Sequence, residues 1–176
     1  MGRDKALLEW QGERLLDVAV GTLSVLCDRV FISSSNPLHA HPDATRIPDA
    51  YGAKGPLGGL ASVLEEVDCG WLLLLPCDMP GMKPEALRAL LAARDEVSEA
   101  VVFEHAGVLQ GQIGLYRRDV LGRALEQLEG GDLSLKCFLR RLALRRVVAD
   151  ASQPWYAPTL FQNINSEGDW QRFKKS

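Results

Sequence analysis

The chain has 176 residues, of which 47% are hydrophobic and 24% are charged, and its formal net charge is −3 at pH 7. This length suits one domain with an adequate core, and the charge lacks the basic excess that nucleic-acid or membrane-surface binding requires. No apolar run approaches the ~20 residues of a membrane span, and the four scattered cysteines favour reduced thiols. We therefore expect a single cytoplasmic domain over residues 1–176, with no nucleic-acid or membrane partner.

The first half of the sequence alternates between helical and strand patterns. Apolar residues recur at helical spacing from Leu15 to Leu26, and residues 29–33 and 45–48 form short apolar runs typical of strands. Pro56 suits the first turn of a helix that continues to about residue 67. The run 71–75 is entirely apolar, which favours a strand covered on both faces, as in a parallel sheet.

The second half continues the alternation. Strands are expected at 100–103, 108–116 and 145–148, and helices at 84–93, at 119–128, at 133–142 with Asp132 as N-cap, and after Ser166, which forms a capping-box pattern with Asp169. This order predicts an α/β fold in three layers, with a doubly wound, mostly parallel sheet. Sites in such folds lie beyond the carboxyl ends of the strands, so residues just after each strand are the candidates for chemistry.

The strongest local motif is Leu75-Pro-Cys-Asp-Met-Pro80, which places Asp78 just beyond a buried strand between two prolines. A carboxylate held there can bind Mg²⁺ together with substrate phosphates, because Mg²⁺ uses few protein ligands. The alternative is a carboxylate that caps a turn. Its position after the strand favours the functional interpretation.

Three further segments carry weaker signals. Glycines 55, 58 and 59 surround a helix start, where they either let the backbone approach an anion or let the helix pack closely on the sheet. Lys5 is either a cation near a nucleotide or part of a solvated N-terminus. His39 and His41 have an H-x-H spacing without a third ligand nearby, which favours exposed loop histidines over a metal site.

Taken in order, these pieces resemble the molybdenum cofactor guanylyltransferase family, whose fold is a Rossmann-like nucleotidyltransferase. The matching segments are Met1-Gly-Arg-Asp-Lys5, Asp49 with Gly55-Pro-Leu-Gly-Gly59, Pro76-Cys-Asp-Met-Pro80 and Gln162-Asn-Ile-Asn-Ser166. The resemblance covers essentially the whole chain. It implies transfer of GMP from GTP to molybdopterin, release of pyrophosphate, and contact with other proteins of the same biosynthesis.

The resemblance also implies roles for single residues. Lys5 and Asp78 would be catalytic, with Lys5 on the GTP phosphates and Asp78 on both Mg²⁺ and nucleotide. Asp49 would belong to the nucleotide pocket, and Ser33 falls where relatives place a nucleotide-contacting asparagine. The alternatives are a cytidylyltransferase or other nucleotidyltransferase, and a non-catalytic protein that binds nucleotide or pterin.

One departure from the family concerns the opening motif. Met1 aligns inside it, so the preceding strand and glycine-rich phosphate loop have no counterpart. Loss of a central strand would leave the neighbouring strands without hydrogen-bonding partners and expose an apolar slot. Each unpaired buried amide costs on the order of 1–3 kcal/mol. We therefore expect that the natural polypeptide begins upstream of Met1.

Overall fold

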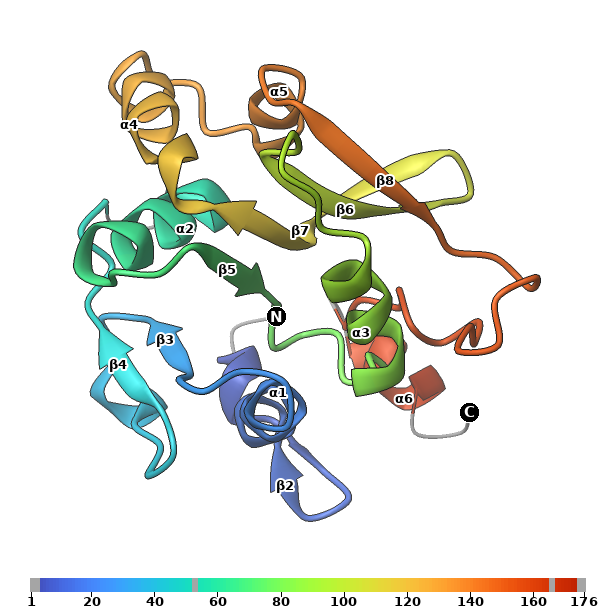
Figure 1. Ribbon diagram of the computed structural model, residues 1–176. Coiled ribbons are helices and arrows are strands. Elements are labelled where there is room, and N and C mark those ends of the chain that lie inside the picture. Colours follow the sequence, from blue (N-terminus) through green and yellow to red (C-terminus); the bar gives the residue numbers. More distant parts are fainter. Residues whose placement is uncertain (1–3, 52–53, 165–166, 174–176) are drawn as a thin grey trace.

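The computed structural model describes residues 4–51, 54–164 and 167–173 (Figure 1). The first part of the chain contributes, in order, η1 (Lys5–Leu7), β1 (Glu9–Trp10), β2 (Glu13–Arg14), α1 (Leu15–Ser24), β3 (Phe31–Ser33), η2 (Pro37–His39) and β4 (Thr45–Ile47). β1 and β2 form an antiparallel hairpin, and β3 and β4 pair in parallel.

The rest of the described chain supplies a four-stranded sheet in the order β5-β7-β6-β8. In chain order, this part of the chain forms α2 (Gly55–Glu66), β5 (Trp71–Leu74), α3 (Pro84–Ala92), β6 (Ala100–His105), β7 (Val108–Arg117), η3 (Arg118–Val120), α4 (Leu121–Glu129), α5 (Leu135–Leu139), β8 (Leu144–Val148) and α6 (Glu167–Phe173). β6 and β8 are parallel, whereas β7 runs antiparallel to both β5 and β6. Across the described ranges, no helix is long and apolar enough to cross a membrane.

Two cores cover the opposite faces of this sheet. Val102 of β6 packs in a cluster with residues of α2, α4 and α5, while its neighbours Val101 and Phe103 pack in a cluster with residues of α3. Successive side chains of a strand point to opposite faces, so helices lie on both sides of the sheet. The expected three-layer α/β fold is therefore confirmed, with a sheet of mixed direction.

Several boundaries differ from the sequence-based expectation. The helix expected at 133–142 is shorter, and its N-cap is Ser134, whose hydroxyl accepts the Cys137 N–H at 3.2 Å. Asp132 instead accepts the N–H of Ser134 at 2.9 Å. Ser166, half of the expected capping box, lies outside the described residues. The β1–β2 hairpin was not expected; it turns at Gln11 and Gly12, which both have positive φ.

A seam separates β3, in the two-stranded β3–β4 sheet, from β5, at the edge of the four-stranded sheet. Within the part of the chain that the structure describes, β3 pairs with β4 and β5 with β7, and no ladder joins the two sheets. Figure 1 shows β3 and β5 facing this gap. A cavity of about 690 Å³ follows it, lined by apolar side chains such as Val20, Ile32 and Leu73. The seam between the two sheets is therefore lined largely by apolar side chains.

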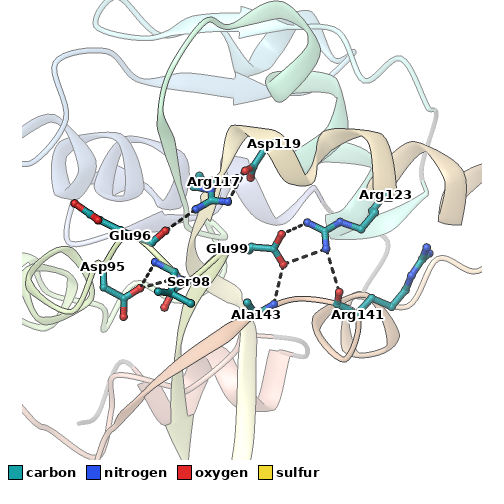
Figure 2. A network of polar contacts seen from close by, with 10 residues as sticks. Asp95, Glu96, Ser98, Glu99, Arg117, Asp119, Arg123, Arg141 and Ala143 are labelled. Atoms are coloured by element: carbon teal, nitrogen blue, oxygen red, sulfur yellow. Dashed lines mark hydrogen bonds and ion pairs between the residues drawn. The ribbon is translucent and has the colours of Figure 1, made fainter.

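A charged network surrounds Glu99, just before β6 (Figure 2). The Glu99 carboxylate accepts hydrogen bonds from Arg123 of α4 and from the N–H of Ala143, just before β8. The hydrogen bond from Arg123 holds the pKa of Glu99 below its ordinary value. β5 and β6 both run antiparallel to β7, so the residues that precede β6 lie far from those that follow β5. The network therefore connects α4 to the starts of β6 and β8, away from the candidate site.

Candidate functional site

Asp78 lies in the loop that follows β5, where the sequence placed it. The preceding strand is apolar, and Met79 is buried directly after the carboxylate. The carbonyl oxygen of Asp78 accepts the N–H of Ile164 at 2.9 Å, which joins this loop to the closing segment of the chain. The Asp78 side chain is 19% exposed, so it is held in place but open to a ligand.

Lys5 reaches Asp78 from 73 residues away, with its Nζ 3.3 Å from Oδ2. It belongs to η1, whose N-cap is Asp4, and its side chain is 33% exposed. The two residues that the family resemblance assigns to catalysis thus lie together as an ion pair. Neighbouring Cys77 is not a nucleophile in this arrangement, because burial and then the Asp78 charge raise the pKa of its thiol to about 11.

The Asn163 amide lies against the same carboxylate. With its nitrogen directed at Asp78, it donates to Oδ1 at 2.7 Å, and to Oδ2 and the backbone oxygen at 3.2 Å each. Sequence analysis named Asn163 only as part of the matching segment Gln162-Asn-Ile-Asn-Ser166. Its contact with Asp78 makes it part of the candidate site.

Ser33 and Asp49 lie on the other side of the seam, beside α2. Ser33 ends β3, and Gly59 packs so closely on it that an added Cβ would lie 3.3 Å from the serine Oγ. Asp49 Oδ1 accepts the N–H of Tyr51 at 3.1 Å and the hydroxyl of Ser62 at 3.4 Å. Both residues line the seam cavity. Gly59 therefore serves close packing of α2, which is one of the two interpretations of the glycine segment.

The loop after β3 holds a contact that sequence analysis missed. The expectation of exposed loop histidines is wrong: the side chains of His39 and His41 are only 14% and 13% exposed. His39 Nε2 lies 2.8 Å from Oδ2 of Asp4, and His41 Nε2 lies 3.6 Å from Oδ1 of Asp17. Each histidine pairs with a carboxylate of the N-terminal region. The paired residues lie far apart in the sequence, so no local sequence pattern predicts these contacts.

Comparison with known proteins identifies the relatives of this chain. Residues 1–147 match the MobA-like NTP transferase domain family. The chain belongs to this family. A Synechococcus elongatus protein named probable molybdenum cofactor guanylyltransferase is 30% identical over 185 residues, covering 100% of this chain and 92% of that protein. A Geobacillus protein of the same name is 27% identical over 175 residues, covering 96% and 89% of the two chains.

Solved structures of the same fold extend the likeness. Molybdopterin-guanine dinucleotide biosynthesis protein A from Archaeoglobus fulgidus has a TM-score of 0.84 at 19% identity, covering 99% of this chain and 90% of that chain. The 2-C-methyl-D-erythritol 4-phosphate cytidylyltransferase of Thermus thermophilus has a TM-score of 0.71 at 17% identity, covering 97% and 92%. The MobA-like chain is therefore a nucleotidyltransferase with a Rossmann-like fold.

The MobA-like site is poor in metal-binding side chains. Across residues 4–51, 54–164 and 167–173, no three His, Cys, Asp or Glu side chains gather as a group able to hold a metal ion. A structural zinc site needs four such ligands, whereas Mg²⁺ is usually bound by one or two carboxylates, water and substrate phosphate. Asp78 with the Asn163 amide matches the second pattern.

Proposed function

We propose that this chain transfers GMP from GTP to molybdopterin and releases pyrophosphate. The observation that carries the proposal is the Lys5–Asp78 pair, which puts a cation and a carboxylate 3.3 Å apart beside the end of β5. Relatives of the same family that match nearly the whole chain carry the guanylyltransferase name. Sites in doubly wound α/β folds lie beyond the carboxyl ends of strands, which is where this pair lies.

Asp78 and Asn163 have the chemistry to hold Mg²⁺ in this proposal. Turned the other way, the Asn163 amide presents its oxygen to the Asp78 carboxylate, and a divalent cation would satisfy both oxygens. A bound Mg²⁺ would offset the charge that develops on the α-phosphate. The protein's contribution is to hold the carboxylate rigidly, through the backbone contact of Asp78 with Ile164.

The other site residues bind and orient the nucleotide. Lys5 exchanges part of its contact with Asp78 for the phosphates of GTP, where its charge steadies the departing pyrophosphate. Asp49 and Ser33 contact the nucleoside from the α2 side of the seam. A terminal phosphate oxygen of molybdopterin attacks the α-phosphorus in line with the leaving pyrophosphate. This oxygen is already ionised at neutral pH, so the reaction needs positioning and charge compensation rather than a general base.

Replacing Lys5 by Ala is expected to lower kcat/KM for GTP by about a hundredfold, because a cation on the leaving group is lost. The measurement is pyrophosphate release at saturating molybdopterin. Lys136→Ala is a matched control, since Lys136 lies on α5, which packs on the face of the sheet opposite to that of Met79. An unchanged kcat/KM in Lys5→Ala contradicts the phosphate role.

Competition between donors separates the alternatives. GTP is expected to support faster pyrophosphate release than CTP or ATP. A preference for CTP would favour the cytidylyltransferase alternative. Binding of GTP by calorimetry without any pyrophosphate release would favour a non-catalytic nucleotide-binding protein. We place the reaction in the cytoplasm, alongside other proteins of the same biosynthesis.

We also propose that an extended apolar segment preceding Met1 fills the seam in the working enzyme. Both strand edges that face the seam lack a ladder partner among the described residues, and the slot between them is largely apolar. Asp4, the first described residue, contacts Asn36 in the loop after β3, and Ser34 and His39 of that loop line the slot. Mass spectrometry of the endogenous protein is expected to give an intact mass above 19.4 kDa, and a mass of 19.4 kDa contradicts the proposal.

A further inference from the structure

Two consecutive residues reach opposite sides of the seam. Asp4 contacts Asn36 and His39, in the loop that follows β3, while Lys5 contacts Asp78, in the loop that follows β5. No ladder joins β3 to β5 in the described chain, so these side-chain contacts link the ends of the two sheets. The position of the Lys5 backbone therefore depends on how firmly Asp4 is held.

Three hydrogen-bond donors hold the Asp4 carboxylate, one at Oδ1 and two at Oδ2. Oδ1 accepts the N–H of Ala6 at 3.1 Å, which caps η1. Oδ2 accepts the Asn36 amide at 2.9 Å and faces His39 Nε2 at 2.8 Å. Burial alone would raise the pKa of Asp4, but these hydrogen bonds and the His39 charge together keep it below its ordinary value. The carboxylate is thus ionised at neutral pH and acts as an acceptor towards all three donors.

The loop after β3 is itself arranged to present two of these donors, the Asn36 amide and His39 Nε2. A carboxylate only accepts, so His39 Nε2 carries the proton towards Asp4, and Nδ1 faces the Ser34 hydroxyl at 2.6 Å. Ser34 Oγ also accepts the N–H of Asn36 at 3.1 Å. The Asn36 side-chain oxygen accepts the N–H of Leu38 at 3.0 Å, which leaves its nitrogen directed at Asp4. Each donor is therefore oriented by another hydrogen bond of the same loop.

We propose that Ser34, Asn36 and His39, named here the Asp4 clamp, are positioning residues for Lys5. The clamp fixes Asp4, Asp4 fixes the first turn of η1, and that turn directs the Lys5 amine towards Asp78 and the nucleotide phosphates. The proposal rests on the proposed function for the phosphate role of Lys5. Because Lys5 contacts the phosphates of bound GTP, a displacement of about 1 Å in its amine weakens GTP binding as well as turnover.

Two substitutions of His39 separate positioning from simple structural support. Glutamine places an amide donor near the position of Nε2 and retains the contact with Asp4, whereas asparagine keeps only the contact with Ser34. His39→Asn is expected to raise KM for GTP roughly tenfold, the value of one charge-assisted hydrogen bond, and His39→Gln to stay within about twofold of wild type. In a Lys5→Ala background, His39→Asn is expected to cause no further loss, because both changes act through the same amine.

His41→Asn is the matched control in the same loop. His41 is equally buried but faces Asp17, and its Nδ1 accepts the N–H of Asp43 at 3.0 Å. Its replacement is expected to leave KM for GTP unchanged. Equal defects in His39→Asn and His39→Gln, or losses that add to that of Lys5→Ala, overturn the proposal.

The ¹³Cε resonance of Lys5 tests the clamp without turnover. It is expected to shift in His39→Asn and to remain at its wild-type position in His39→Gln and His41→Asn. A wild-type protein that releases no pyrophosphate from GTP would refute the proposed function, while this resonance still reports on the clamp. A Lys5 resonance that is the same in all three variants overturns the clamp, whatever the activity.

Discussion

Asp78→Asn is expected to lower guanylyl transfer on the order of a thousandfold while the fold is retained. The asparagine side chain has nearly the same shape but no charge, so it loses both the metal-binding carboxylate and the ion pair with Lys5. The backbone contact of residue 78 with Ile164 does not depend on the side chain, so the loop keeps its place. The measurement is kcat for pyrophosphate release across a Mg²⁺ titration, with Tm recorded for the same samples.

Asp132→Asn supplies a matched control for this charge removal. Asp132 is exposed and accepts the N–H of Ser134, which an asparagine oxygen also does. It is expected to turn over at the wild-type rate. Near-normal activity of Asp78→Asn would remove Asp78 from the mechanism, and a collapse of Tm would show that the carboxylate serves the fold instead.

The sequence predicts the elements of this fold better than their pairing. Helical periodicity locates α1, prolines in the first turn locate α2 and α3, and a continuous apolar run locates β5, each within a few residues. The direction of β7 has no such pattern: it follows β6 after a tight turn at Ala106 and Gly107, both with positive φ, and this turn makes the pair an antiparallel hairpin. Pairing depends on turn geometry and on distant strands, so the sequence does not show that β7 runs against β5, β6 and β8 in an otherwise parallel sheet.

The residues of the candidate site also differ in how well the sequence predicts them. Asp78 was predicted from local sequence, since two prolines and a strand end surround it. Lys5 came from family resemblance, and its contact with Asp78 spans 73 positions. The pairing of His39 with Asp4 was missed because it spans 35 positions and joins the N-terminal segment to the loop after β3. Long-range polar contacts of this kind leave no periodicity in a single sequence.

Gly81→Ala is expected to affect stability and activity together. Gly81 follows the Asp78 loop, and a Cβ there would lie 2.4 Å from the carbonyl oxygen of Thr159 and 3.0 Å from its carbonyl carbon. Both are backbone atoms, which cannot turn aside as a flexible side chain does. We expect a loss of about 2 kcal/mol in the free energy of unfolding, equivalent to a fall of about 6 °C in Tm for a chain of this size.

The added methyl group should also move the closing segment away from Asp78. Residues 159–164 form a short stretch that ends in the contact of Ile164 with the Asp78 carbonyl, so a shift at Thr159 reaches Asn163. Activity measured well below Tm is therefore expected to fall more than the folded fraction does. Gly122→Ala is the control: the position is open and lies in α4, where alanine should stabilise by about 0.5 kcal/mol. If Gly81→Ala lowers Tm but leaves kcat unchanged, the closing segment supports the fold without positioning Asp78.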